Sequence, residues 1–209
     1  MDVSMKKCKK SRILWLLAAI FLLFAVGIYL RNNTGLISKI PVLTVETPQK
    51  LKRSSDEIFV LDVRISDLGD ALYPAASLSI SFDSSCLEFM GLEEGNLFVL
   101  GDGNAAGKSR KLPEWNCNPE ACNKSGMVNL MYLDMTGGKY AFSKQLLPED
   151  EEDHVVVRLK FRLRGSVRAG DIFELIVEDA VFAASDETKS LAMTTETLKV
   201  KNSRVVIGE

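Results

Sequence analysis

Histidine is nearly absent from this sequence of 209 residues. The single histidine is His154, so a Ser-His-Asp or Cys-His catalytic arrangement has only one imidazole to use. It starts an alternating apolar segment beside the acidic run 149–153, and we expect it at a solvated strand end. No pair of carboxylates stands in an apolar setting that would raise the pKa of one of them, as glycoside hydrolysis requires. We therefore expect a protein that is not an enzyme.

A strong excess of charge of either sign is also missing. The chain has 26 Lys and Arg against 28 Asp and Glu, a formal net charge of −2, with the two signs interspersed over most of its length. Such a surface has no field strong enough to gather nucleic acid. No Gly-x-Gly-x-x-Gly follows a predicted strand, so nucleotide binding has no support either.

One long hydrophobic run lies near the N-terminus. Residues 13–30 carry no charge, and a helix of that length at about 1.5 Å per residue just reaches the roughly 30 Å of hydrocarbon in a bilayer. Five basic residues stand before it: Lys6, Lys7, Lys9, Lys10 and Arg12. Basic residues keep that end in the cytoplasm, so the chain after Arg31 should be extracytoplasmic. A cleaved secretory signal is the alternative, although Tyr29, Leu30 and Arg31 do not suit its cleavage site.

The four cysteines are too few for a disulfide framework. Cys117 and Cys122 lie in one polar stretch beyond the hydrophobic run, where a disulfide could close a small loop. The alternative is that these two cysteines bind zinc, but no second Cys or His pair accompanies them to complete such a site. The acidic run 148–153 lacks the ligand spacing of a calcium loop. We expect no metal and no cofactor.

Apolar and polar side chains alternate from residue 41 onward, which is the period of a strand with one buried face. The clearest case is 154–164, whose outward positions Arg158, Lys160 and Arg162 predict a strongly basic outer face. The polar segment 101–126 is long for a connection in a compact domain unless it has a function or is tied down. The predicted strands span 42–46, 56–66, 76–82, 96–100, 128–134, 154–164, 172–178 and 197–206.

Short alternating strands at nearly regular spacing predict an all-β fold, an antiparallel two-sheet jelly-roll-like sandwich. Together with the hydrophobic run they predict a single-pass protein of the cell membrane. Its expected parts are a cytoplasmic basic tail at 1–12, a transmembrane signal-anchor helix at 13–30, a linker at 31–40 and an extracellular sandwich at 41–209.

The order of these segments resembles cohesin domains, the bacterial sandwich modules that bind dockerins in cellulosomes and related cell-surface assemblies. The stretch LSISFD at 78–83, followed by CLEF at 86–89, is similar to the family's F-x-x-x-Y-D-P-x-V-L-E-V. Later, VNLMYLDMTGGKYAFSK at 128–144 resembles the family's I-x-F-L-F-x-D-x-S-G-x-G-A-Y-x-I-x. The segments 155–164 and 169–183 continue the match in order, and the resemblance covers nearly all of 41–208.

The resemblance implies a dockerin-like partner, bound on one sheet face by the strand at 75–81 and by the strand and turn at 130–138. Carried over position by position, it implies five partner-binding residues: Tyr73, Ser77, Met131, Asp134 and Gly137. Where many cohesins place an Asn and an Asp on the first of these strands, this chain has Ala75 and Ser77.

The resemblance favours a non-catalytic, membrane-anchored extracellular module that recognises a dockerin-like protein for cell-surface assembly. A polysaccharide-binding module is one alternative, because exposed aromatic rings stack on sugar faces. Its candidate residues are Tyr73, Trp115, Tyr132 and Tyr140, of which Tyr132 shares a strand face with apolar neighbours and suits the core. A structural cell-surface domain is the other alternative.

Overall fold

The computed structural model describes residues 40–48, 51–52, 58–101, 110–136, 140–165, 167–185 and 192–208. All of them belong to one compact unit, Ile40–Glu209. The predicted basic tail, the predicted transmembrane helix and the linker up to residue 39 lie outside the described residues and stay predictions. Within the described ranges, no helix has the length and apolar character needed to cross a membrane.

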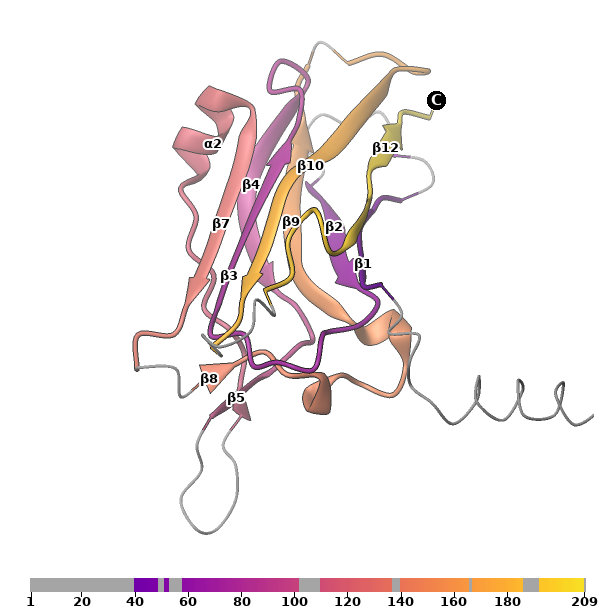
Figure 1. Cartoon of the computed structure of the whole chain (residues 1–209). Helices are drawn as coiled ribbons and strands as arrows, with labels where there is room; N and C mark the ends of the chain where they lie inside the picture. The colour runs from indigo at the N-terminus through magenta and orange to yellow at the C-terminus, as the bar shows by residue number, and fades with distance from the viewer. Residues whose placement is uncertain are drawn as a thin grey trace, which may run out of the picture. The chain divides into compact units, whose positions relative to one another are not determined.

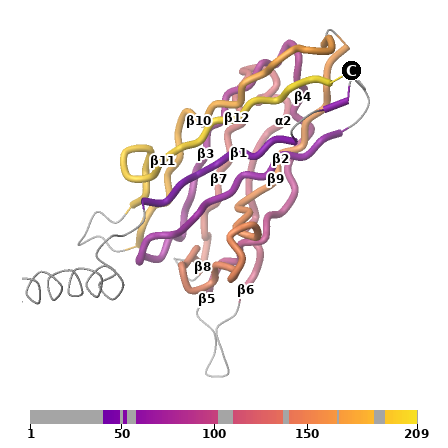
Figure 2. The backbone as a smooth tube through the Cα atoms, turned by 90° about the vertical axis from the view of Figure 1, so that its right-hand side faces the viewer, coloured from indigo at the N-terminus to yellow at the C-terminus, as the bar shows by residue number. Residues whose placement is uncertain are grey.

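Two sheets pack against each other, and a small third sheet closes one end of the sandwich (Figures 1 and 2). The first sheet has the order β11 (Lys199–Lys201), β1 (Val42–Glu46), β2 (Ile58–Ile65), β9 (Val155–Leu163) and β4 (Leu87–Glu94). The second has the order β12 (Ser203–Val206), β10 (Ile172–Ala183), β3 (Ala75–Ser81) and β7 (Met127–Leu133). The third consists of β6 (Arg110–Lys111), β5 (Val99–Gly101) and β8 (Tyr140–Ala141).

The prediction of an all-β sandwich is confirmed, but the first sheet is mixed rather than purely antiparallel. β1 pairs with β11 in parallel, whereas the other strand pairs named above are antiparallel. The cause is that the predicted strand 197–206 divides at Asn202 and passes from one sheet to the other. Before Asn202 the chain lies beside β1 as β11, in the parallel direction, and after it the chain pairs with β10 of the second sheet as β12, in the antiparallel direction.

The apolar side chains of the alternating pattern point inward and fill the space between the sheets. Phe161 on β9 lies at the centre of one aromatic cluster, with ring centroids 6.0 Å from Phe59, 5.2 Å from Phe82 and 5.4 Å from Phe89. Phe82 follows β3 of the second sheet, so this cluster joins the two layers. Edge-on and offset ring pairs of this kind contribute about 1 kcal/mol each beyond the area they bury.

The described part of the polar segment 101–126, residues 110–126, is tied down. β5 and β6 form a short hairpin, and residues 119–125 form a helix, α2 (Pro119–Ser125), that the strand pattern did not predict. The Asn118 side chain caps its start by accepting from the Ala121 amide at 3.1 Å, and Gly126 ends it at φ 68°. Two 3-10 turns, η1 (Lys144–Leu146) and η2 (Glu151–Asp153), precede β9.

His154 is buried, so the expectation of a solvated strand end is wrong. Its Nδ1 lies 3.2 Å from the Ile65 carbonyl oxygen and its Nε2 lies 2.9 Å from the Pro148 carbonyl oxygen. The reason is that η2 folds the acidic run back over the start of β9. A backbone carbonyl oxygen thus faces each ring nitrogen, and a neutral imidazole donates to one of the two. The imidazole has a structural role.

Candidate docking face on the second sheet

The outer face of the second sheet is built from alternate residues of three neighbouring strands. β3 lies between β10 and β7, and its outward residues are small: Ala75, Ser77, Ser79 and Ser81. Ser77 is in register with Met131 on β7 and with Val181 on β10. Because side chains on a strand alternate between faces, these three point the same way. In Figure 1 the three strands lie side by side.

Large apolar side chains gather at one end of this face. Met131 is 52% exposed and Leu133 is 48% exposed, although both belong to a regular strand. Met135, just beyond β7, is 84% exposed. We call these three residues the apolar end. Scattered exposed apolar residues are ordinary, but a contiguous group on a flat sheet face is typical of a binding site.

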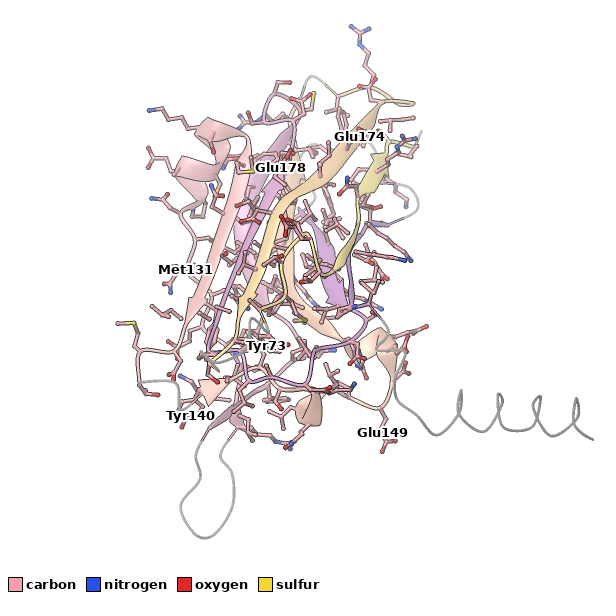
Figure 3. All side chains as sticks on the ribbon, viewed as in Figure 1. Tyr73, Met131, Tyr140, Glu149, Glu174 and Glu178 are labelled. Carbon is pink, nitrogen blue, oxygen red and sulfur yellow. The ribbon has the colours of Figure 1, made fainter. Side chains whose placement is uncertain are left out.

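Carboxylates gather toward the other end of the same face, and Figure 3 shows Glu174 and Glu178 on β10 above the level of Met131. Asp179 is in register with Ser79, next to Asn129 on β7. The Ser81 hydroxyl donates to Glu178 at 2.8 Å. Glu178 and Asp179 are both exposed, and neither forms an ion pair within the described part of the chain. We call these two residues the acidic end.

An open hollow of about 660 Å³ adjoins the acidic end. Its lining includes Ser81, Glu174 and Ile176 from the face itself, together with Arg204 of β12. The Arg204 guanidinium lies 3.0 Å from the Glu174 carboxylate, so this acidic group is already paired. The hollow is therefore a polar recess with an apolar floor at the edge of the face.

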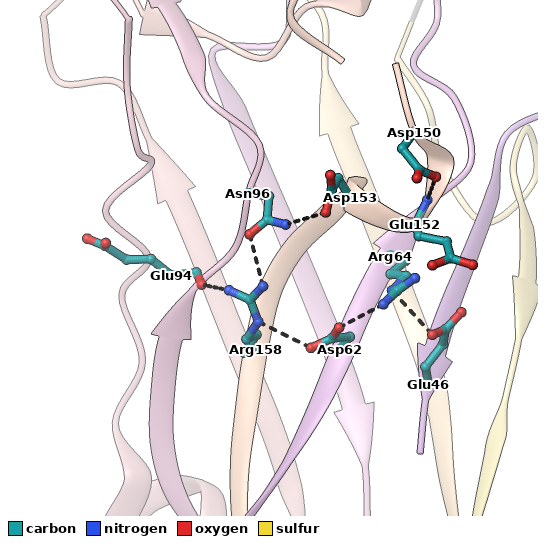
Figure 4. A network of polar contacts seen from close by, with 9 residues as sticks. All are labelled: Glu46, Asp62, Arg64, Glu94, Asn96, Asp150, Glu152, Asp153 and Arg158. Atoms are coloured by element: carbon teal, nitrogen blue, oxygen red, sulfur yellow. Dashed lines mark hydrogen bonds and ion pairs between the residues drawn. The ribbon is translucent and has the colours of Figure 1, made fainter. Parts of the chain in front are cut away.

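The outer face of the first sheet is chemically different, because its charges pair with one another. Arg158 lies 3.3 Å from Asp62, and Arg64 reaches both Asp62 at 3.0 Å and Glu46 at 3.2 Å (Figure 4). The predicted basic residues of β9 are thus matched by carboxylates of the neighbouring strands. The other two pairs join Lys160 to Glu93 at 3.7 Å and Arg162 to Glu88 at 2.6 Å.

One of these ion pairs shifts a pKa. The Arg162 guanidinium donates to the Glu88 carboxylate, and this hydrogen bond lowers the pKa of Glu88 below its ordinary value of 4.5. The carboxylate therefore stays ionised near neutral pH. A sheet face whose charges are already paired in this way offers little to a charged partner.

Ser77 and Met131 lie on the candidate face as the resemblance implied, but Tyr73 does not. The Tyr73 side chain is 1% exposed, and its ring packs edge-on against Phe182 with centroids 6.2 Å apart. Its backbone bridges to Phe142 in both directions, at 3.0 and 2.9 Å. Tyr73 precedes β3 at a core-facing position, so a partner on the outer face cannot reach it, and its assignment as a contact residue is corrected.

Asp134 has a structural task at the turn after β7. Its carboxylate accepts from the Thr136 amide at 3.0 Å, from the Thr136 hydroxyl at 2.6 Å and from the Tyr140 amide at 3.0 Å. These bonds fix the turn that presents Met135. Gly137, the last implied contact, lies outside the described residues.

The resemblance did not point to several residues of the face. Leu133 carries the same outward signal as Met131 in the alternation of β7. Asn116 was missed altogether: its amide donates to the Met131 carbonyl at 2.8 Å and its carbonyl accepts from the Met131 amide at 3.1 Å. This bridge covers the free edge of β7 beside the apolar end. It joins two segments that α2 separates in the sequence, so no local pattern could have revealed it.

The aromatic residues considered for sugar binding do not form an exposed row in the described part of the chain. Tyr73 and Tyr132 are buried, and Trp115 is half-buried with its ring 6.1 Å from Tyr132 and 6.0 Å from Phe142. Burial raises the pKa of Tyr132 to about 12. Tyr140 is half-buried next to Lys111. The rings of Tyr73, Trp115 and Tyr132 belong to a second aromatic cluster, which Phe142 and Phe182 join.

Cys117 and Cys122 flank the start of α2, and both are free thiols in the structure. Cys122 is buried and Cys117 half-buried, and burial raises the pKa of the Cys117 thiol. Their disulfide stays a prediction. Among the residues that the structure describes, no group of three His, Cys, Asp or Glu side chains is placed to hold a metal ion.

No family model and no curated protein matches the sequence. Solved structures do match. The sixth cohesin of scaffoldin B from Acetivibrio cellulolyticus, in complex with a mutant Cel5 dockerin, has a TM-score of 0.54 and 17% identity over 80% of this chain and 98% of that one. The Coh-OlpA-Doc918 complex, a type I cohesin–dockerin complex from Clostridium thermocellum, has a TM-score of 0.55 and 17% identity over 81% and 99%.

A third match is the seventh ScaB type I cohesin from Pseudobacteroides cellulosolvens, with a TM-score of 0.53 and 12% identity over 80% of this chain and 92% of that one. The structural neighbours are thus consistently cohesin modules, and the match extends over nearly the whole of each of these modules. At such low identity the likeness concerns the fold. The chain therefore has the cohesin fold that the resemblance in its sequence implies.

Proposed function

We propose that this protein is a non-catalytic binding module that docks a dockerin-like helical domain on the outer face of its second sheet. We propose further that residues 13–30 anchor it in the cell membrane with the sandwich outside. The anchor rests on the hydrophobic run and the basic residues before it. The partner class rests on the cohesin fold, because several cohesin neighbours were solved with dockerins bound.

The observation that carries the docking site is the contrast between the two outer faces. The first sheet pairs its charges internally, whereas the second leaves Met131 and Leu133, in the last part of the regular strand β7, about half exposed. Burying the remaining apolar surface of each would contribute about 1 kcal/mol. The small outward side chains of β3 beside them leave room for a helix to lie close to the sheet.

Site-specific photo-cross-linking in the producing cells tests this proposal. The cross-linking amino acid p-benzoylphenylalanine replaces Met131 in the full-length chain, and a matched chain carries it at Ile58. Ile58 is 49% exposed on β2, on the outer side of the first sheet, so the two positions are equally accessible. We expect a protein containing a dockerin-like domain to cross-link from position 131 and not from position 58.

The captured domain, expressed alone, is then titrated by calorimetry against the full-length chain in mild detergent. The double variant Met131→Gln, Leu133→Gln removes apolar area without adding charge, and it should weaken binding by about 30-fold, corresponding to about 2 kcal/mol. The matched control Ile58→Gln should leave the dissociation constant unchanged. Cross-linking from both positions alike, or equal weakening by both variants, would place the partner elsewhere and overturn the proposal.

A further inference from the structure

The two ends of the docking face have opposite chemistry, which matters for the direction in which a partner can lie. The strands β3, β7 and β10 contain no Lys or Arg at all, and their charged residues are Glu174, Glu178 and Asp179. The neighbouring strand β12 contributes Arg204, and its guanidinium is paired with Glu174. A partner side chain near Glu178 and Asp179 would therefore meet negative charge.

A β-bulge creates this acidic pair. The register between β10 and β3 shifts between Val177 and Asp179, so the successive side chains of Glu178 and Asp179 are both exposed. Bulges re-aim side chains in this way. Two carboxylates thus stand side by side without a cation from the described strands β3, β7 and β10.

Space for a long cationic side chain lies next to these carboxylates. The open hollow of about 660 Å³ is lined by Ser81, Asp83 and the Glu174–Arg204 ion pair, and the Ser81 hydroxyl also contacts Glu178 just outside it. Ile176 contributes apolar surface to the same hollow. A Lys or Arg side chain suits this combination, because its methylene stem can lie on apolar surface while its charged group reaches the carboxylates.

The distance between the ends sets the spacing in the partner. Ser77 is level with Met131. Asp179 is level with Ser79, two residues further along β3, and Glu178 contacts Ser81, four residues further along. Two to four residues at about 3.4 Å correspond to roughly 7 to 14 Å, which a helix lying along the strands covers in about five to nine residues. From Leu133, which is level with Ala75, the corresponding distance takes about nine to 14 helical residues.

We infer that the partner docks in one fixed direction, through a helix with apolar residues at the Met131 and Leu133 end and a Lys or Arg about five to 14 positions away facing Glu178 and Asp179. This inference rests on the proposed function, because it concerns the same face and the same partner. It adds the charge and the orientation of the docking helix. Attraction between the acidic end and that cation also accelerates encounter.

The charge is tested with the domain captured from position 131, expressed alone. Glu178→Lys combined with Asp179→Lys should weaken its binding by at least about tenfold, and replacing the partner's facing Lys or Arg by Glu should restore much of the loss. The matched control is Glu174→Gln on the same strand, whose carboxylate is already paired. Association with the unaltered chain should slow as NaCl rises from about 0.05 to about 0.5 M, and much less with Glu178→Gln, Asp179→Asn.

The direction is tested by placing the photo-cross-linker at position 81 as well as at position 131 and mapping the linked peptides in the partner. We expect the two positions to reach sites about nine residues apart in one helix, in a single order. Both orders in one sample would overturn the fixed direction. A charge reversal that changes the dissociation constant less than about twofold, while Met131→Gln, Leu133→Gln still weakens binding, would overturn the acidic contact and leave the proposed function standing. Failure of position 131 to capture a dockerin-like domain would overturn both.

Discussion

Asn123 on α2 supports the edge of the first sheet, and its removal should destabilise the sandwich. The Phe89 amide donates to the Asn123 side-chain oxygen at 2.8 Å, and the Asn123 amide group donates back to the Phe89 carbonyl at 2.8 Å. It also donates to the Pro119 carbonyl at 3.0 Å. The side chain thus acts as a one-residue strand on β4, whose far edge no other strand of the first sheet occupies.

The size of the effect follows from these three hydrogen bonds. Each contributes about 1 kcal/mol, and Asn123→Ala leaves partly buried groups of Phe89 without their partner, so the free energy of unfolding should fall by about 2 to 3 kcal/mol. For a domain of this size the melting temperature should fall by about 5 to 10 °C. The neighbouring Lys124 is exposed on the same helix, so Lys124→Ala should change stability by less than about 0.5 kcal/mol.

Urea unfolding followed by circular dichroism measures the free energy, and amide hydrogen exchange reports on the Phe89 amide itself. That amide should exchange faster in Asn123→Ala, while amides in the centre of β9 keep their protection relative to global unfolding. If Asn123→Ala and Lys124→Ala were equally mild, or the Phe89 amide kept its protection, the support of β4 by α2 would be refuted.

Three further predictions address other parts of the fold. Gly95→Ala should lower the free energy of unfolding by more than about 2 kcal/mol, because an added Cβ would collide with the backbone carbonyls of Val155 and Val156. The control is Gly165→Ala, because nothing lies within 4 Å of an added Cβ there. Equal melting temperatures for the two variants would contradict the collision. Because the folded pKa of Glu88 lies below 4.5, its ion pair should stabilise the fold above that pH and lose this contribution as pH falls through the lowered pKa. The free energy of unfolding, measured with urea from neutral to acidic pH, should therefore depend less on pH in Glu88→Gln than in the unaltered protein. The same pH dependence in both would argue against the ion pair. Finally, peptide mapping of the protein isolated from its producing cells should find Cys117 linked to Cys122, a disulfide that would contribute about 2 kcal/mol by closing a short loop. Complete alkylation of both thiols in the native protein would exclude it.

The strands were predictable because the buried face of each shows in the sequence as alternating apolar residues. The predicted bounds of β1 agree with the structure, and β9 lies within the predicted 154–164. The parallel pairing of β11 was not predictable, because it depends on where the chain crosses between sheets at Asn202. The helix α2 was missed although Asn118, Pro119 and Gly126 are typical helix boundary residues. It buries only Cys122 among its seven residues, so no apolar period marks it.

The candidate site was predictable in part for a similar reason. Alternation places Ser77 and Met131 outward, and the structure puts them side by side. The same reasoning did not exclude Tyr73, because this residue precedes the regular strand and its backbone is held by a bridge to Phe142, which is distant in the sequence. Likewise, the burial of His154 depends on η2 and on two carbonyls supplied by other segments.

Which outward face is free for a partner is a property of strand neighbours, and a single strand cannot reveal it. Read alone, β9 with its three outward cations is the most conspicuous binding surface in the sequence. Its neighbours β2 and β4 supply Asp62, Glu88 and Glu93, which pair with those cations and leave the face nearly neutral. The opposite holds for β10. Its carboxylates look like ordinary solvated charges in the sequence, yet the neighbouring strands β3 and β7 contain no cation that could pair with Glu178 or Asp179. The unmatched charge therefore lies on the same sheet as the unmatched apolar surface, and a partner that supplies both complements has one way to lie on it.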